Sequence, residues 1–261
     1  MVKELILDND RVALPGLGSF VAEVVPSTFS DKGYTINPPY RRLHFRSKPD
    51  EGRELAGFYA SPTHLMAGAE YDEVMEVVET YADKFESVRV AEPLLGEVGS
   101  DATVINEDKK AVAEIITAEA VKDAGFDSIE AAKEDGTAFV FMGHGTHHTA
   151  MVTYSQMQTQ MNELGYDNVF IGTVEGDEAF LADAIIENVA AAGYTKVVLR
   201  PLMVVAGDHA NNDMAGAEED AWLAMFNASG KFESVDAQVE GLGQIEAIQQ
   251  IYVDHTAAVL K

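Results

Sequence analysis

The sequence predicts an α/β protein built on a parallel β-sheet. From about residue 85 onward, short apolar runs alternate with segments of helical pattern, which is the rhythm of strand–helix–strand units. The run AFVFMG (138–143) contains no polar side chain, as is typical of a strand buried on both faces of such a sheet. With 261 residues, 47% of them hydrophobic, the chain can bury one large core or two modest ones.

The elements of this α/β part follow in order. Apolar runs predict strands at 87–95, 138–143, 168–176 and 196–207. An asparagine at the cap position, acidic residues in the first turn and a closing glycine predict a helix at 106–125. Comparable signals predict helices at 151–165, 177–193 and 215–230, and apolar periodicity predicts an amphipathic closing helix at 244–260.

Residues 1–60 follow a different pattern. Proline and glycine recur at short intervals there, and the segments VALPG, SFVAEVV and RLHFR predict short strands joined in hairpins. This segment carries eight Lys/Arg and eight Asp/Glu, whereas residues 61–261 carry ten against thirty-six. The second segment therefore holds the whole acidic excess behind the net charge of −26.

The composition argues against several classes of protein. No apolar run approaches the length of about 18 residues that a membrane span needs, and the first apolar stretch is too short for a signal-peptide core. We therefore expect a cytoplasmic protein without a membrane partner. The chain has no cysteine, so a metal site must use His, Asp, Glu or external ligands. Its acidity repels nucleic acid and acidic membranes.

Three predicted strands end in side chains that can bind a metal. His144 follows the first strand, Glu175 ends the second and His209 follows the third. Because the carboxyl ends of parallel strands meet at one edge of a sheet, we expect these side chains to lie close together. Two imidazoles and a carboxylate suit a divalent first-row ion, whereas each residue alone is more often a hydrogen-bonded loop residue.

Nearby residues leave alternatives open. Asp208 either orients an imidazole or caps the following helix. His147 and His148 are either outer-shell ligands or a solvated helix start. The glycines beside the three side chains, Gly143, Gly145, Gly176 and Gly207, let backbone or a flat ligand approach closely.

The motifs together resemble a known family. VFMGHGTHH (140–148), GTVEG (172–176), PLMVVAGDHANNDMAG (201–216) and SPTHLMAGAEYDEV (61–74) are similar to motifs of the anaerobic cobalt chelatases of the CbiK type. The resemblance covers about residues 61–261. It implies a class II chelatase-like fold of two Rossmann-like lobes with parallel sheets. It also implies that Co²⁺ and sirohydrochlorin are the substrates, without ATP, in cobalamin biosynthesis.

The same resemblance implies roles for four residues. His144 matches the cleft histidine of the family's GHG motif, which is placed to bind metal and to accept pyrrole protons. Glu175 and His209 match the other two members of the metal-binding set, and Glu70 matches an acidic residue near the active site. Since His144 cannot bind metal and accept a proton through one nitrogen at once, either its roles alternate or Glu70 or a water takes the proton.

The first segment resembles another family. Residues 8–60, and within them GLGSFVAEVVPSTFSDKGYTINPPYRRLHFR (16–46), are similar to the second half of HU-like DNA-binding domains from Bacteroides-type bacteria. The opening strand and helix of a CbiK-type chelatase have no counterpart here. We therefore expect an atypical HU-like β-rich segment at 1–60, the remainder of an incomplete first lobe at 61–135, and a second lobe with the metal site at 136–261.

Three functions follow as hypotheses. The first is an active cobalt chelatase, the second a catalytically impaired metal- or tetrapyrrole-binding protein, and the third a DNA-associated protein that uses residues 1–60. Binding the carboxylates of sirohydrochlorin requires local positive charge, for which Arg200 and Lys196 are positional candidates unless they are solvated. An exposed strand edge left by an incomplete lobe could produce a homo-oligomer.

Overall fold

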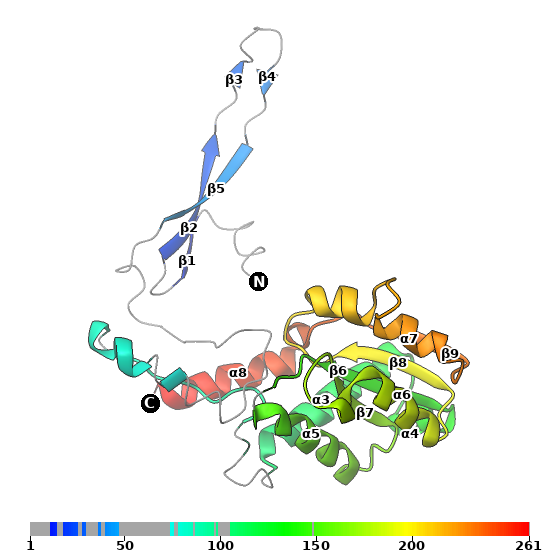
Figure 1. The fold of residues 1–261 in the computed structure, drawn as a ribbon. Helices are drawn as coiled ribbons and strands as arrows, with labels where there is room; N and C mark the ends of the chain where they lie inside the picture. Colours follow the sequence, from blue (N-terminus) through cyan, green and yellow to red (C-terminus); the bar gives the residue numbers. More distant parts are fainter. Residues whose placement is uncertain are drawn as a thin grey trace. The chain divides into compact units, whose positions relative to one another are not determined.

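A computed structural model describes residues 11–14, 18–25, 28–29, 36–37, 40–46, 74–75, 78–85, 87–96, 98, 105–147 and 149–260. Backbone contacts divide the chain into two units, Met1–Phe58 with Val78–Arg89 and Tyr59–Val77 with Val90–Lys261 (Figure 1). The predicted domains 1–60, 61–135 and 136–261 stay a prediction.

The first unit contains the predicted β-rich segment. Strands β1 (Arg11–Leu14), β2 (Gly18–Val25) and β5 (Tyr40–Arg46) form an antiparallel sheet in the order β1-β2-β5. The short strands β3 (Thr28–Phe29) and β4 (Ile36–Asn37) pair with each other. A short 3₁₀ helix, η1 (Ala82–Lys84), also belongs to this unit. The strands predicted at VALPG, SFVAEVV and RLHFR are thus confirmed.

The second unit is built on the predicted parallel sheet. Strands β6 (Thr137–Gly143), β7 (Val169–Thr173), β8 (Lys196–Pro201) and β9 (Ser234–Ala237) lie in the order β7-β6-β8-β9, and every pairing is parallel. The apolar run that predicted β6 is fully buried because this strand is central and has neighbours on both edges. The carboxyl ends of β6, β7 and β8 therefore share one edge of the sheet.

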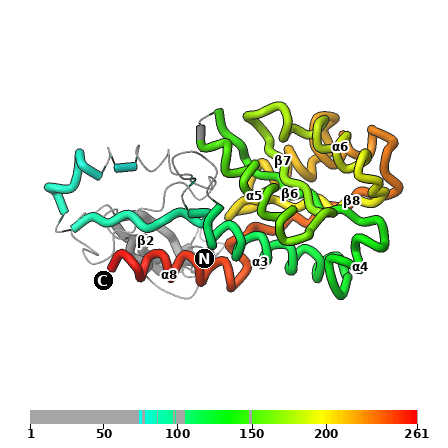
Figure 2. Tube along the Cα trace, turned by 90° about the horizontal axis from the view of Figure 1, so that it is seen from below, coloured from blue at the N-terminus to red at the C-terminus, as the bar shows by residue number. Residues whose placement is uncertain are grey.

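Helices pack on both faces of this sheet (Figures 1 and 2). The core on one face includes residues of α3 (Glu107–Asp123), α5 (Val152–Glu163) and α8 (Glu246–Val259), with α4 (Ile129–Glu134) beside them. The core on the other face includes residues of α6 (Ala182–Ala191) and α7 (Trp222–Ala228). Among the described residues the unit also has four single-turn elements: η2 (Thr149–Met151), η3 (Glu178–Phe180), the π-helical turn η4 (His209–Met214) and η5 (Leu242–Gln244).

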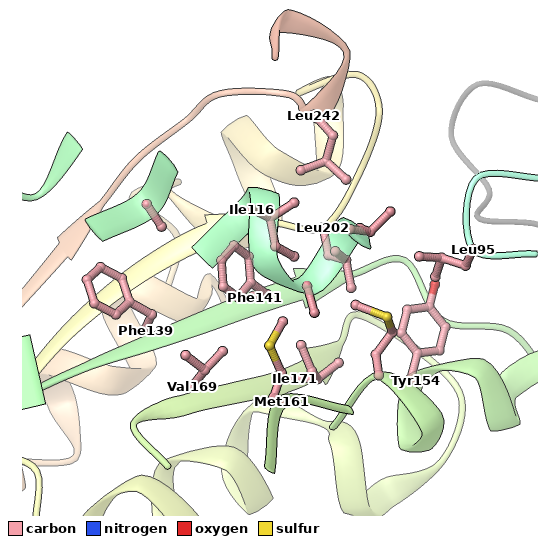
Figure 3. Close-up of a cluster of buried hydrophobic side chains, with 14 of the residues drawn as sticks. Leu95, Ile116, Phe139, Phe141, Tyr154, Met161, Val169, Ile171, Leu202 and Leu242 are labelled. Carbon is pink, nitrogen blue, oxygen red and sulfur yellow. The ribbon is translucent and has the colours of Figure 1, made fainter. Parts of the chain in front are cut away.

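Strand periodicity divides the side chains of β6 between the two cores. Phe139 and Phe141 contact the α3–α5–α8 side, where Figure 3 shows Phe141 near Ile116. Ala138, Val140 and Met142 alternate with them and face the α6–α7 side. Full burial of each phenylalanine contributes about 2 kcal/mol to folding. The position of β6, and of the residue that follows it, is fixed by both cores.

Two predicted strands differ from the structure. Residues 87–95 contain one isolated bridge residue, Arg89, and a turn at Leu94–Leu95. Pro93 has no N–H to donate, and its carbonyl instead accepts from Gly96 N (2.9 Å) to close that turn. The strand predicted at 196–207 ends at Pro201, because Leu202 and Met203 leave the sheet and enter the two separate cores. Their apolar character reflects burial and not strand pairing.

Two cations are buried in the second unit. The Arg200 guanidinium is 1% exposed; it donates from Nη1 to Asp123 Oδ2 (2.6 Å) and Gln238 Oε1 (2.7 Å), and from Nη2 to Glu240 Oε2 (3.1 Å). The expectation that the Arg200 side chain is solvated is therefore wrong. Lys109 Nζ donates to Leu95 O (2.9 Å), and burial lowers the pKa of its ammonium to about 8 although Asp108 acts in the opposite direction.

Among the described residues, no helix is long and apolar enough to cross a membrane.

The ion pairs of Arg200 allow a matched test of stability. Asp123→Asn removes a partly buried countercharge from a guanidinium that water cannot reach, so we expect the free energy of unfolding to fall by about 3 kcal/mol. Glu240→Gln removes a carboxylate that is 53% exposed, so its cost should stay below about 1 kcal/mol. Urea unfolding followed by circular dichroism measures both. Equal losses would show that burial does not set the strength of these pairs.

Candidate metal centre

The three predicted side chains lie at the carboxyl edge of the sheet, with His144 beside each of the other two. His144 directly follows β6, Glu175 follows the end of β7 at Thr173, and His209 begins η4 in the connection after β8. Because β6 lies between β7 and β8, the segments after these strands are neighbours. The sheet order thus brings together residues that are far apart in the sequence.

Backbone hydrogen bonds hold His144 beside Glu175. The parallel pairing of β6 and β7 continues past the strands, with Val174 N donating to Gly143 O (3.0 Å) and Glu175 N donating to His144 O (3.0 Å). His144 Nδ1 consequently lies 3.6 Å from Glu175 Oε1. The His144 side chain is 16% exposed and that of Glu175 is 47% exposed, so the pair lies at the border between core and solvent.

The imidazole of His209 lies against that of His144. Their ring centroids are 4.6 Å apart, and the rings are nearly perpendicular, at 84°. The Nδ1 atom of His209 forms a short hydrogen bond with the carboxylate of Asp213, one turn further along η4. Since a carboxylate can only accept, this Nδ1 carries the proton, and the lone pair of the neutral ring is on Nε2.

His144 is oriented in the same way by the backbone. Its Nδ1 lies 2.9 Å from Gly145 O, a carbonyl that accepts a hydrogen bond, so the lone pair of the neutral ring is again on Nε2. Both histidines thus have Nδ1 bound to an acceptor, which is the arrangement that fixes metal-ligating imidazoles in proteins. With the Glu175 carboxylate, the donor set is chemically suited to a divalent first-row ion.

Gly145 is the residue that lets the two strand ends come so close. Its φ of +84° lies in the left-handed region, and a Cβ there would stand 1.8 Å from the Glu175 carbonyl oxygen. Its N–H donates to the Tyr154 hydroxyl (3.1 Å), which ties the turn to α5. The expectation that this glycine permits a close approach is correct, and the group that approaches is backbone.

The remaining predictions have mixed outcomes. Glu70 and His148 lie outside the described residues, so the role predicted for Glu70 stays a prediction. His147 is described and exposed. Asp208 occupies the cap position of η4, yet its side chain makes no capping bond and instead accepts from Asn212 Nδ2 (2.6 Å). The residue that orients His209 is Asp213, which was not among the predicted site residues. The signal for it is the H-x-x-x-D spacing, which places His209 and Asp213 on one face of a helical turn.

Two oriented imidazoles and a carboxylate at the edge of a parallel sheet are a donor set typical of proteins that bind divalent metal ions. Residues 56–261 match the family model described as cobalt chelatase (CbiK), and the chain belongs to this family. The family predicted from the motifs is therefore confirmed, and so is the α/β fold class, with its all-parallel sheet. Residues 1–49 match the model of the CCDC81-like prokaryotic HU domain 1, which agrees with the second resemblance.

Two relatives carry the same enzyme name. The chain is 29% identical over 192 residues to the sirohydrochlorin cobaltochelatase of Salmonella typhimurium, and the match covers 74% of this chain and 64% of that protein. It is 31% identical over 199 residues to the sirohydrochlorin cobaltochelatase CbiKC of Nitratidesulfovibrio vulgaris, which covers 75% of this chain and 63% of that protein. The chain thus spans slightly less than two thirds of the length of these relatives.

Replacing Gly145 tests how strictly the geometry is required. Gly145→Ala places a methyl group on the Glu175 carbonyl, so the strand ends must separate, and Co²⁺ affinity should fall at least about tenfold. Gly193→Ala is the matched control: its φ is +89° but nothing lies within 4 Å of its Cβ position, so it should cost only backbone strain of about 1 kcal/mol. Isothermal titration with Co²⁺ and thermal unfolding measure the two effects. Unchanged affinity in Gly145→Ala would contradict the assignment.

The hydrogen bond from Asp213 provides a second test. Asp213→Asn removes the anion that fixes the tautomer and orientation of His209, so Co²⁺ affinity should fall between about 10-fold and 100-fold. Asp208→Asn, which changes a neighbouring carboxylate that bonds Asn212, should leave the affinity within about twofold. Equal effects in the two variants would mean that the local negative charge matters and the orientation of the ring does not. The same titration distinguishes these results.

Proposed function

We propose that this chain inserts Co²⁺ into sirohydrochlorin without ATP. The observation that carries the proposal is the convergence of His144, Glu175 and His209 at one sheet edge in a member of the cobalt chelatase family. Sirohydrochlorin is the macrocycle named for the two relatives, and we propose it as the substrate of this chain.

The metal is bound first by the two imidazoles and the carboxylate. The Nε2 atoms of His144 and His209 and an oxygen of Glu175 occupy only part of the coordination sphere of Co²⁺, so positions stay open for the pyrrole nitrogens. Exchange of these ligands for ring nitrogens releases the ion into the macrocycle. The ligands must therefore bind tightly enough to remove water from the ion and weakly enough to give it up.

Two pyrrole protons must leave as the metal enters. A metal-bound Nε2 cannot take one, and the Nδ1 atoms of both histidines already carry protons that they donate to Gly145 O and Asp213. This favours a proton acceptor outside the three ligands, and we assign that role to Glu70, with water as the alternative. His144 then accepts a proton only after the ion has left it.

Substitution of the ligands should separate chemistry from folding. His144→Ala and His209→Ala each remove a ligand and should abolish insertion, and Glu175→Gln should reduce it at least about tenfold, with unchanged helical circular dichroism. Glu187→Gln, on α6, is the matched control because Glu187 pairs only with exposed Lys231 in the described contacts, and it should retain full activity. Full activity in both histidine variants would refute the site.

The assay itself is anaerobic incubation of the full chain with sirohydrochlorin and Co²⁺, following the absorbance change of the macrocycle against a control without protein. Acceleration supports a chelatase. A folded protein that binds Co²⁺ or sirohydrochlorin without accelerating insertion would instead support the catalytically impaired binding protein.

A second candidate function rests on the match of residues 1–49 to an HU domain. It is DNA association through the antiparallel sheet, whose strand β5 has the sequence YRRLHFR. Electrostatic binding of this kind weakens steeply with salt, so a fluorescence titration with duplex DNA at low and moderate ionic strength tests it. Arg41→Gln with Arg42→Gln should then abolish binding and leave cobalt insertion unchanged.

A further inference from the structure

A second set of ligand-type side chains lies away from these strand ends. Glu92 precedes the turn before α3, Asp108 is in the first turn of α3, and His255 is on the closing helix α8. One ligand atom from each side chain lies within 4.8 Å of the others. In the described part of the chain, no other group of three or more His, Cys, Asp or Glu side chains brings its ligand atoms this close together. The group shares no residue with the His144–Glu175–His209 set.

The orientation of the His255 ring is the central observation. Its Nδ1 lies 3.1 Å from the backbone carbonyl of Glu92, which fixes the Nδ1–H tautomer of a neutral ring. The Nε2 lone pair then faces Asp108 Oδ1 at 3.0 Å. Two acceptors at that distance repel each other unless a cation, either a proton or a metal ion, lies with them. The Glu92 carboxylate adds a third ligand, the second with a negative charge, on the exposed side.

The three segments are held in place by contacts other than these side chains. The N-terminus of α3 is capped by Asn106, whose side chain accepts from Lys109 N (3.0 Å), and Lys109 Nζ binds Leu95 O across the turn. Gly96, with φ +61°, packs so closely that a Cβ would stand 2.6 Å from Asp108 Oδ2. Ile248 anchors α8 in the same core. The ligands are therefore positioned before any ion binds.

We propose that Glu92, Asp108 and His255 bind a divalent transition-metal ion that clamps the closing helix to the start of α3. One imidazole and two carboxylates suit Zn²⁺, Mn²⁺ or Co²⁺, and the Nδ1 bond to the Glu92 carbonyl is the outer-shell contact usual for a metal-ligating histidine. The side chains of His255 and Asp108 are 14% and 26% exposed, whereas Glu92 is exposed. An ion would therefore enter from solvent on the side of Glu92.

The competing occupant is a proton, which would make His255 and Asp108 a simple ion pair. The two cases differ in their response to metal, and Glu92 separates them because its carboxylate is needed only for the metal. The experiment uses the full chain with His144→Ala, Glu175→Gln and His209→Ala, so that the sheet-edge ligands are removed and the result does not depend on the proposed chelatase function.

Zn²⁺ is the probe, measured by equilibrium dialysis with elemental analysis and by thermal unfolding. The triple variant should retain one Zn²⁺ per chain, and its Tm should rise by about 5 °C at a hundredfold excess over Kd. Adding Glu92→Gln should weaken Zn²⁺ binding at least about tenfold without changing the Tm of the metal-free protein. Adding His255→Gln should remove the Zn²⁺-dependent rise in Tm.

Asp254→Asn serves as the matched control on the same helix, because Asp254 bonds Gln250 and points to neither Glu92 nor Asp108 in the described contacts. It should leave the Zn²⁺ stoichiometry unchanged. The proposal is overturned if the triple variant binds no Zn²⁺, or if Glu92→Gln and His255→Gln bind it as the triple variant does. Should His255→Gln fail to fold, the Glu92→Gln result decides.

Discussion

The parallel pairing of β6 with β7 on one edge and β8 on the other is the constraint on which the candidate metal centre depends. Residues 144, 175 and 209 have no local reason to meet, and it is the order β7-β6-β8 that places their segments side by side. The hydrogen bonds that continue past the strands, from Val174 to Gly143 and from Glu175 to His144, extend this constraint to the ligands themselves. A shift of register at β6 would separate them and expose Phe139 or Val140 to the wrong core.

The elements that the sequence predicted well are those whose pattern has a single physical cause. The run at 138–143 is apolar because β6 is central, and the cap of α3 works through Asn106, as its position predicted. The strand predictions over 87–95 and 202–207 were wrong because an apolar residue indicates burial, whereas a strand also requires backbone hydrogen bonds to a neighbouring strand. Leu94, Leu95 and Leu202 fill the core from turns and connections. The short strand β9 (SVDA) and the short helix α4 lack a periodic signal of useful length.

The proximity of the candidate ligands was predictable from the sequence, but the groups that orient them were not. Strand ends identify candidate positions, and the parallel topology brings them together, so His144, Glu175 and His209 could be selected without coordinates. Asp213 could not be distinguished from Asp208 by sequence, because both lie within one turn of His209 and either could reach the ring. In the structure it is the carboxylate of Asp213, four residues further along η4, that bonds His209 Nδ1, whereas Asp208 bonds Asn212.

The distribution of charge bears on the order of binding that the proposed cobalt insertion would require. Five described cations of the second unit, Lys122, Lys133, Lys196, Arg200 and Lys231, are already paired with carboxylates, and a sixth, Lys109, is buried against Leu95 O. Arg200 and Lys196 are thus committed to the fold and are poor candidates for the carboxylates of sirohydrochlorin. In the proposed reaction, a net charge of −26 would attract Co²⁺ and repel the anionic macrocycle. A metal ion held by His144, Glu175 and His209 would supply positive charge at the place where the macrocycle must approach, which favours metal binding before macrocycle binding.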